Sequence, residues 1–429
     1  MIRVHFGKGN YMELSLLEQA EIIRIFIALA LLLGSAFVFG SLVEKIKGPR
    51  VVGEILGGML IGGSGLFLLF PNFMGLIFNA YPEEGKILNV FYQMGLIFLM
   101  FLSGFSTKIE VDCKNLKIIS LVFLGATLLP MLGCIPFFNV FQEYFIGDMG
   151  NVFSYRMVFA IGVAITSIPV ISKIFFDMGV MNTRFSNAVL TIATFQDLLL
   201  WILLNMATRN ADSGKLCFGD SLVVSVATIG MFVVVKFLSK YMNGVKLRLS
   251  TNVFYTLSFI ALLLISGLFY MVGINIMYSS FLVGYVVKAL FGNLAEANNR
   301  IKYLEHFVFS FFVPIYFALV GFQLNVFHNF SFFRFVMFFG IAFGLEFIGT
   351  WLFLILGKVS NTTKLNFAIT MNARGGPGIV LATVAYGASI ISLEFFTVLV
   401  LTTMLSSMIA GYYLRLRQRK DKVFFDKLT

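Results

Sequence analysis

The chain has 429 residues, of which 59% are hydrophobic and only 12% are charged, and its formal net charge is +11. Soluble proteins carry about 25% charged residues, so this composition excludes a soluble domain and indicates a polytopic, all-α membrane protein. The positive charge requires no nucleic-acid partner, because basic residues cluster in the cytoplasmic loops of membrane proteins. The cysteines (Cys113, Cys134 and Cys217) and the histidines are scattered, so neither a disulfide framework, a resident metal nor a cofactor is expected.

Apolar runs of about 20 residues, the length that crosses a bilayer, predict thirteen transmembrane helices. In chain order they cover 21–43, 49–70, 88–106, 115–138, 153–176, 184–208, 220–242, 252–272, 275–291, 304–324, 331–357, 363–388 and 393–417. The ninth span is short, and its boundary with the eighth is the least defined. We expect a single transmembrane domain over residues 1–429, without a soluble regulatory domain.

The distribution of basic residues predicts how these spans are oriented. The loops after odd-numbered spans, together with the C-terminal tail, hold most of the lysine and arginine. The loops after even-numbered spans hold only Lys86, Arg156, Arg209, Lys215 and Arg334. Because basic residues are retained on the cytoplasmic side, we expect an outward-facing N-terminus, a cytoplasmic C-terminus and an odd number of spans.

Span six carries a carboxylate near its middle, in the stretch "TIATFQDLLLWILL" at residues 191–204. The polar residues of this span recur on one face of a helix, and they are Asn187, Thr191, Thr194, Asp197 and Asn205. An ionised Asp197 that faced lipid would cost about 2.5–3.5 kcal/mol. The polar face is therefore expected to line the bundle interior or a watery cavity. Intramembrane carboxylates commonly bind ions or protons; the alternative is a protonated aspartic acid that serves packing alone.

Two spans contain helix-breaking residues near their middle. Span five reads "AIGVAITSIPVISKIFF", in which Pro169 removes a backbone donor next to the hydroxyls of Thr166 and Ser167. Span twelve reads "MNARGGPGIVLA", and its helix-breaking residues are Gly375, Gly376 and Pro377. The two spans are seven apart and so run in opposite directions, as expected of an inverted repeat with crossed discontinuous helices. This pattern predicts a secondary transporter with its site at the membrane midplane.

Two further charges lie inside predicted spans. Arg374 stands at the break in span twelve, where it could satisfy freed carbonyls or pair with a carboxylate, and the sequence leaves both roles open. Glu346 lies near the middle of span eleven, beside a small-residue contact face of Ala342, Gly349 and Thr350. Glu346 is a candidate for proton coupling, with a structural hydrogen-bonding role as the alternative.

Five stretches, in order, resemble the monovalent cation:proton antiporter-2 family, which includes the bacterial Kef-type potassium/proton antiporters and the plant cation/proton exchangers. These stretches are "GPRVVGEILGGMLIGGSGL" (48–66), "GLIFLMFLSGFSTKIE" (95–110), residues 164–204, "PIYFALVGFQLNV" (314–326) and "MNARGGPGIVLA" (371–382). The resemblance implies an inverted-repeat antiporter fold in a bacterial plasma membrane. It also implies a moving core of residues 115–208 and 331–417 and a dimerisation bundle of residues 21–106 and 220–324, and hence a homodimer.

The resemblance also implies roles for individual residues. Asp197 matches the aspartate that binds the cation or the proton, and Thr166 and Ser167 match the unwound segment beside it. Gln196 occupies the position that separates subgroups, where an amide is associated with electroneutral exchange. Arg374 matches an arginine in the plant-type version of the second break.

One position departs from the family's pattern. Glu346 stands where the family commonly has a lysine, three residues before the preserved Gly349 and Thr350. A second carboxylate near Asp197 would share a proton or a cation with it. Glu346 is therefore a candidate for a coupling role alongside Asp197.

The expected function is the exchange of Na⁺ or K⁺ for protons by alternating access, with electroneutral stoichiometry. The expected partners are the transported cation, protons and the lipid bilayer, and the sequence leaves the choice of cation open. An alternative is a carrier of an organic anion or metabolite that uses Arg374 and helix N-termini. A membrane-embedded enzyme is disfavoured, because the loops are short and hold no His/Asp cluster.

Overall fold

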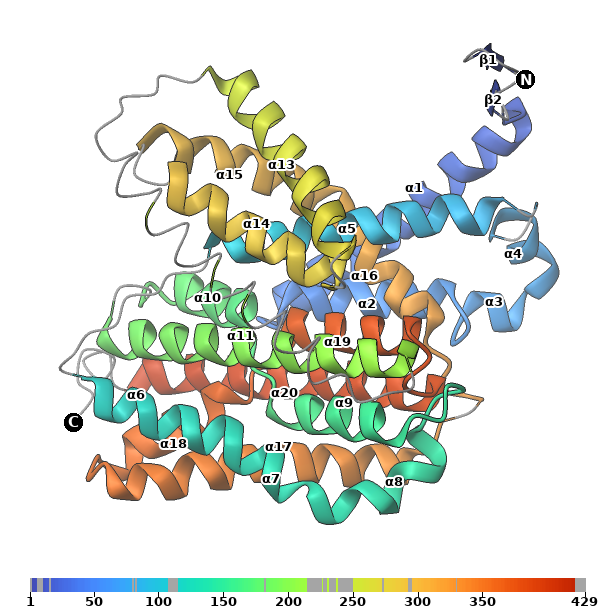
Figure 1. The fold of residues 1–429 in the computed structure, drawn as a ribbon. Coiled ribbons are helices and arrows are strands. Elements are labelled where there is room, and N and C mark those ends of the chain that lie inside the picture. Colours follow the sequence, from blue (N-terminus) through green and yellow to red (C-terminus); the bar gives the residue numbers. More distant parts are fainter. Residues whose placement is uncertain are drawn as a thin grey trace.

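The computed structural model describes residues 2–5, 11–14, 17–78, 81, 83–106, 115–180, 183–213, 226, 230, 237, 250–271, 274–291, 295–328 and 330–420 (Figure 1). Within these residues, nine helices are long and apolar enough to cross a membrane, and two shorter apolar helices accompany them. A small antiparallel hairpin precedes the first helix, formed by β1 (Ile2–His5) and β2 (Tyr11–Leu14). The sequence did not predict this hairpin; the rest of the described chain has the expected helical class.

Every predicted span other than the seventh coincides with described helices. Seven spans are single helices: α1 (Gln19–Lys45), α5 (Glu84–Ser106), α11 (Arg184–Ser213), α13 (Thr251–Met271), α14 (Ile276–Phe291), α17 (Phe332–Leu356) and α20 (Leu393–Lys420). The second span is α2 (Arg50–Ile61) followed by α3 (Leu66–Leu69), and the tenth is α15 (Ala295–Ser310) followed by α16 (Phe312–Gln323). The seventh predicted span, 220–242, lies outside the described residues apart from three isolated positions.

The remaining segments belong to the fourth, fifth and twelfth spans and to short connections. The fourth span consists of α6 (Leu116–Phe123), the π-helical turn η2 (Leu124–Leu128) and α7 (Leu129–Gly133). The fifth consists of α9 (Val152–Ala164) and α10 (Ile168–Asp177), and the twelfth of α18 (Asn361–Met371) and α19 (Gly375–Gly387). The short helix α4 (Pro71–Phe78) connects the second and third spans. Two further short helices, η3 (Ile135–Phe137) and α8 (Phe138–Phe145), continue the apolar segment of the fourth span to Phe145.

The described helices pack mainly within two bundles. The scaffold bundle contains α1 to α5 and α13 to α16, and the core bundle contains α6 to α11, η2, η3 and α17 to α20. Figure 1 shows the scaffold bundle in the upper part of the view and the core bundle below it. The candidate site residues all belong to the core bundle.

Close backbone contacts hold the scaffold bundle together. A Cβ atom added at Gly58 of α2 would lie 1.9 Å from a backbone oxygen of α16, and one added at Gly321 of α16 would lie 2.0 Å from a backbone oxygen of α2. Gly104 of α5 and Gly284 of α14 form a second reciprocal pair of this kind. Small residues permit this approach, which is a main source of helix association in membranes.

Both discontinuous helices are interrupted beside the helix breakers of the sequence. α9 ends at Ala164 and α10 begins at Ile168, so Pro169 lies in the first turn of α10, where a missing backbone donor is tolerated. α19 begins at Gly375, which has a φ of +37° that favours glycine, and Pro377 lies in the first turn of that helix. The two interruptions are in contact, because the Ser167 amide donates a hydrogen bond to the Ala373 carbonyl at 2.7 Å, and this contact is called the crossing below.

Candidate functional site

The end of α9 exposes backbone carbonyls that have no partner within the helix, and two side chains from elsewhere in the core bundle satisfy them. The Arg374 guanidinium donates from Nη1 to the Gly162 carbonyl at 3.0 Å and from Nη2 to the Val163 carbonyl at 2.9 Å. The Gln196 amide of α11 donates to the Ala164 carbonyl. Arg374 also places a positive charge at a helix C-terminus, where the helix dipole favours it.

Glu346 of α17 is the counter-charge of Arg374. Arg374 Nη2 and Glu346 Oε2 are 2.9 Å apart, and the two side chains are 1% and 0% exposed. Thr166 Oγ1 lies 3.1 Å from Glu346 Oε1 and donates to the Met371 carbonyl at 2.6 Å. Arg374 thus performs both of the roles that the sequence left open, and the ion pair ties α17 to the crossing of the two broken helices.

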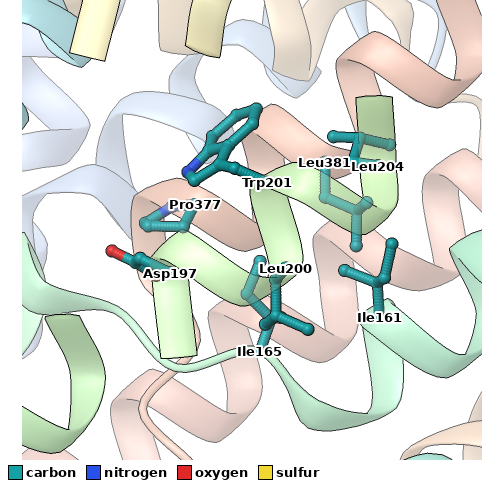
Figure 2. A pocket seen from close by; sticks show the side chains of 8 residues that line it. All are labelled: Ile161, Ile165, Asp197, Leu200, Trp201, Leu204, Pro377 and Leu381. Atoms are coloured by element: carbon teal, nitrogen blue, oxygen red, sulfur yellow. The ribbon is translucent and has the colours of Figure 1, made fainter. Parts of the chain in front are cut away.

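Asp197 lies apart from this network. Its side chain is buried, at 2% exposure, and its Oδ1 atom has no hydrogen-bond partner among the described residues. It adjoins a small pocket whose other lining residues are apolar: Ile161, Ile165, Leu200, Trp201, Leu204, Pro377 and Leu381. Figure 2 shows Asp197 at one end of this group and Ile161, Leu204 and Leu381 at the other. A buried carboxylate oxygen without a partner is costly unless a proton or a cation compensates it.

Of the other predicted site residues, Pro377 also lines this pocket, whereas Gln196, Thr166, Ser167, Glu346 and Arg374 do not. Gln196 is directed to the end of α9, and its Nε2 also reaches the Ala126 carbonyl of η2 at 3.3 Å. Ser167 Oγ accepts a hydrogen bond from the Val170 amide at 3.3 Å and so caps the start of α10. The described contacts therefore bring Thr166, Glu346 and Arg374 together at the crossing, while Asp197 faces the pocket.

The polar face of span six contains groups that are already engaged. Thr191 and Thr194 are buried, and each hydroxyl donates to a carbonyl of α11 four residues earlier, at 2.8 Å in both cases. Asn205 Oδ1 accepts from the Asn275 amide at 2.6 Å, just before α14 begins. Four residues of this face are buried, as the sequence predicts, whereas Asn187, near the start of α11, is exposed. The two threonine hydroxyls bond within their own helix and do not extend the pocket.

Trp201 is a pocket residue that the sequence reasoning missed. It lines the pocket beside Asp197, and its ring stacks on Tyr278 of α14, with ring centroids 6.2 Å apart and planes at 8°. Trp201 follows Asp197 by four residues, so it lies on the same face of α11. That spacing, in a chain with only two tryptophans, was a signal available in the sequence.

Comparisons with known proteins agree with this architecture. A family model described as "Sodium/hydrogen exchanger, transmembrane" matches residues 29–416. The chain is 26% identical over 399 residues to Cation/H(+) antiporter 17 of Arabidopsis thaliana. The matched region covers 89% of this chain and 46% of that protein. It is 25% identical over 390 residues to K(+)/H(+) antiporter 1 of Saccharomyces cerevisiae, with 85% and 43% covered. The chain therefore spans less than half the length of these two relatives.

A solved structure extends the comparison to the whole fold. The sodium proton antiporter MjNhaP1 from Methanocaldococcus jannaschii, at pH 8, superposes with a TM-score of 0.62 over 93% of this chain and 97% of that chain. The sequence identity in this superposition is 16%. The likeness is one of fold.

Proposed function

The chain belongs to the transmembrane sodium/hydrogen exchanger family, and on that premise we propose that it exchanges a monovalent cation, Na⁺ or K⁺, for protons across a membrane. The observation that carries the proposal is Asp197, a buried carboxylate whose Oδ1 atom has no partner among the described residues. A proton and a cation each compensate this charge, and they cannot do so together. Exchange follows from their competition for one carboxylate, without covalent chemistry.

The residues around Asp197 take supporting roles in this proposal. Gln196 lies outside the pocket and holds the end of α9 through its bond to the Ala164 carbonyl, although its Oε1 atom has no hydrogen-bond partner among the described residues. Thr166 and Ser167 shape the unwound segment after α9, whose backbone carbonyls are further candidate ligands. Glu346 and Arg374 neutralise each other beside the crossing, which leaves Asp197 to carry the exchanged charge.

Alternating access would come from movement of the core bundle relative to the scaffold bundle. The scaffold bundle would also form the interface of a homodimer. The mainly intra-bundle packing of the helices supports such a movement. We propose a bacterial plasma membrane from the resemblance to the Kef-type antiporters. The basic loops support an N-terminus outside and a C-terminus in the cytoplasm. Compensation of a single carboxylate by one proton or one monovalent cation supports electroneutral exchange.

The hydrogen bonds that Arg374 already makes favour a cation over an organic anion as the substrate. An anion carrier on this scaffold would need the guanidinium to receive the substrate. Here Nη1 and Nη2 of Arg374 already donate to two carbonyls of α9 and to Glu346.

The test of the proposal is exchange by the purified protein in liposomes that contain a pH-sensitive dye. After a pH gradient is imposed, addition of Na⁺ or K⁺ should dissipate it. Asp197→Asn should reduce this response to the level of empty liposomes. Glu54→Gln is the matched control, because Glu54 is an equally buried carboxylate that pairs with Arg50 in the scaffold bundle, and it should retain exchange. Wild-type exchange by Asp197→Asn would refute the proposal.

A further inference from the structure

Three buried hydroxyls meet where the two bundles touch. Tyr92 of α5 and Tyr316 of α16 belong to the scaffold bundle, and Thr383 of α19 belongs to the core bundle. The Tyr92 hydroxyl donates to Thr383 Oγ1 at 3.0 Å, and the Tyr316 hydroxyl lies 3.2 Å from the same atom. The two tyrosine rings pack against each other with centroids 5.1 Å apart. Both phenols thus converge on one side chain of the other bundle.

The position of Thr383 connects this cluster to the candidate site. Pro377 and Leu381 of α19 line the pocket beside Asp197, and Thr383 follows Leu381 by two residues on the same half-helix. The scaffold therefore holds the same short helix that forms one wall of the pocket. A shift of α19 relative to α5 and α16 would change the pocket and break these hydrogen bonds together.

We propose that Tyr92, Tyr316 and Thr383 form a latch that holds the core bundle in this position relative to the scaffold bundle and opens in each exchange cycle. The second half of this statement rests on the proposed function. A shift of the core by one helical turn, about 5.4 Å, would carry Thr383 out of reach of both phenols. The Tyr316 and Thr383 hydroxyls would lose these hydrogen bonds, and the Tyr92 hydroxyl would keep only its interaction with Gln323 of its own bundle. That loss favours the latched position.

The latch differs from other polar contacts between the bundles. Asn205 of α11 accepts from the backbone amide of Asn275, and Tyr412 of α20 donates to the backbone carbonyl of Ile46 at 2.7 Å. Such contacts can be remade with another backbone group after a shift. The latch instead joins side chain to side chain, so its hydroxyls can be removed one atom at a time.

The experiment measures the position of the core bundle by the distance between two spin labels in the full-length protein in liposomes. The labels replace Leu263 of α13 and Leu352 of α17, which are 73% and 49% exposed, in a background whose native cysteines are substituted. Thr383→Val and the double variant Tyr92→Phe/Tyr316→Phe remove latch hydroxyls with little change of shape. Each variant should raise the fraction of molecules with a second label-to-label distance by about five- to tenfold. This is the shift expected when one or more hydrogen bonds that favour the latched position are lost.

Two controls separate the latch from a general loss of packing. Thr383→Ser keeps the hydroxyl and should give the wild-type distance distribution. Tyr155→Phe removes an equally buried phenol that donates to the Phe138 carbonyl at 3.2 Å within the core bundle, and it should also leave the distribution unchanged. The latch is refuted if Thr383→Val and the double variant match wild type, or if Tyr155→Phe shifts the population equally.

The distance measurement does not depend on transport. If wild-type liposomes show no cation-dependent proton movement while the latch variants shift the population, the proposed function fails and so does opening in each cycle, but the holding role of the latch stands. If exchange is present and the distances do not change, the latch alone fails.

Discussion

At the scale of single residues, Arg374 and Glu346 decide how the crossing of the broken helices is stabilised. The guanidinium is buried and bonded to two carbonyls of α9, and its charge is compensated by Glu346. Removing one member of a buried pair leaves an uncompensated charge, which usually costs more than the pair itself contributes. Glu346 is thus a positioning residue for Arg374 and, through it, for the end of α9.

Glu346→Gln should therefore lower the free energy of unfolding by about 3–5 kcal/mol, because Arg374 loses its counter-charge. The measurement is thermal or denaturant unfolding in detergent. A double variant, Glu346→Gln/Arg374→Met, should be destabilised by less than the sum of the two single variants, because the charges are removed together. Full stability of Glu346→Gln together with a loss of exchange would instead make Glu346 a proton-coupling group.

A matched control comes from the ion pair between Arg334 and Glu394, at the start of α17 and α20. The two side chains are 27% and 9% exposed, so water can replace a lost partner. Glu394→Gln should cost clearly less stability than Glu346→Gln.

At the scale of helices, α17 and η2 approach so closely that only glycine fits between them. A Cβ atom at Gly349 would lie 2.2 Å from the Gly125 carbonyl oxygen, and one at Gly125 would lie 2.5 Å from the Gly349 oxygen. Gly349 follows Glu346 by three residues on the same helix. This contact therefore fixes the distance at which α17 presents Glu346 to the crossing.

Gly349→Ala should destabilise the protein by about 1–3 kcal/mol or more, because the added methyl group separates α17 from η2. It should also weaken exchange, since Glu346 moves with the helix. Gly344→Ala on the same helix is the control, because a Cβ atom there meets nothing within 4 Å. Equal unfolding midpoints for the two variants would contradict this account.

The helices and their interruptions could be predicted from the sequence because both depend on local chemistry. Apolar length defines a span, and Pro169, Gly375 and Pro377 disfavour a continuous helix wherever they stand. The periodicity of α11 predicted correctly that Asp197 is buried. The partners of the polar groups could not be predicted in this way, because they come from residues far away in the chain.

Gln196 illustrates why the partners of buried polar groups could not be predicted from the sequence. Neighbouring residues on a helix differ in direction by about 100°, and here Asp197 lines the pocket while Gln196 does not. Which of them does so depends on the position of α9, to which Gln196 donates. Glu346 depends in the same way on Arg374, because the sequence could not show that this guanidinium bonds to carbonyls of α9 and to Glu346 together.

At the scale of the whole molecule, the contacts within a bundle differ in kind from the contacts between the two bundles. Within the scaffold bundle, glycine pairs bring backbones into contact, and such contacts leave little room for sliding. Between the bundles, the described polar contacts are a few side-chain hydrogen bonds. Relative movement of two stiff bodies is therefore less costly than deformation of either one.

The rate of exchange should be nearly independent of membrane potential. Among the described core residues, the buried carboxylates Glu346 and Glu394 are paired with arginines. In the proposed exchange, Asp197 is then the charge that one proton or one monovalent cation neutralises. The measurement is exchange in liposomes held at zero or at about 100 mV by a potassium ionophore, with Na⁺ as the test cation. A change below twofold is expected, and a rate that follows the potential would indicate unequal exchange.

The Glu346–Arg374 pair has a consequence for movement of the core bundle when no ion is bound. Because the pair cancels its own charge, a core bundle without cargo carries the uncompensated charge of Asp197 into the membrane interior. Moving one elementary charge through 100 mV involves about 2.3 kcal/mol, in addition to the cost of its dehydration. In the proposed exchange cycle, an unloaded return would therefore be the least favourable step, so few cycles would dissipate the ion gradient without exchange. Glu346 and Arg374, which need not touch the transported ion, would thereby help to couple the two fluxes.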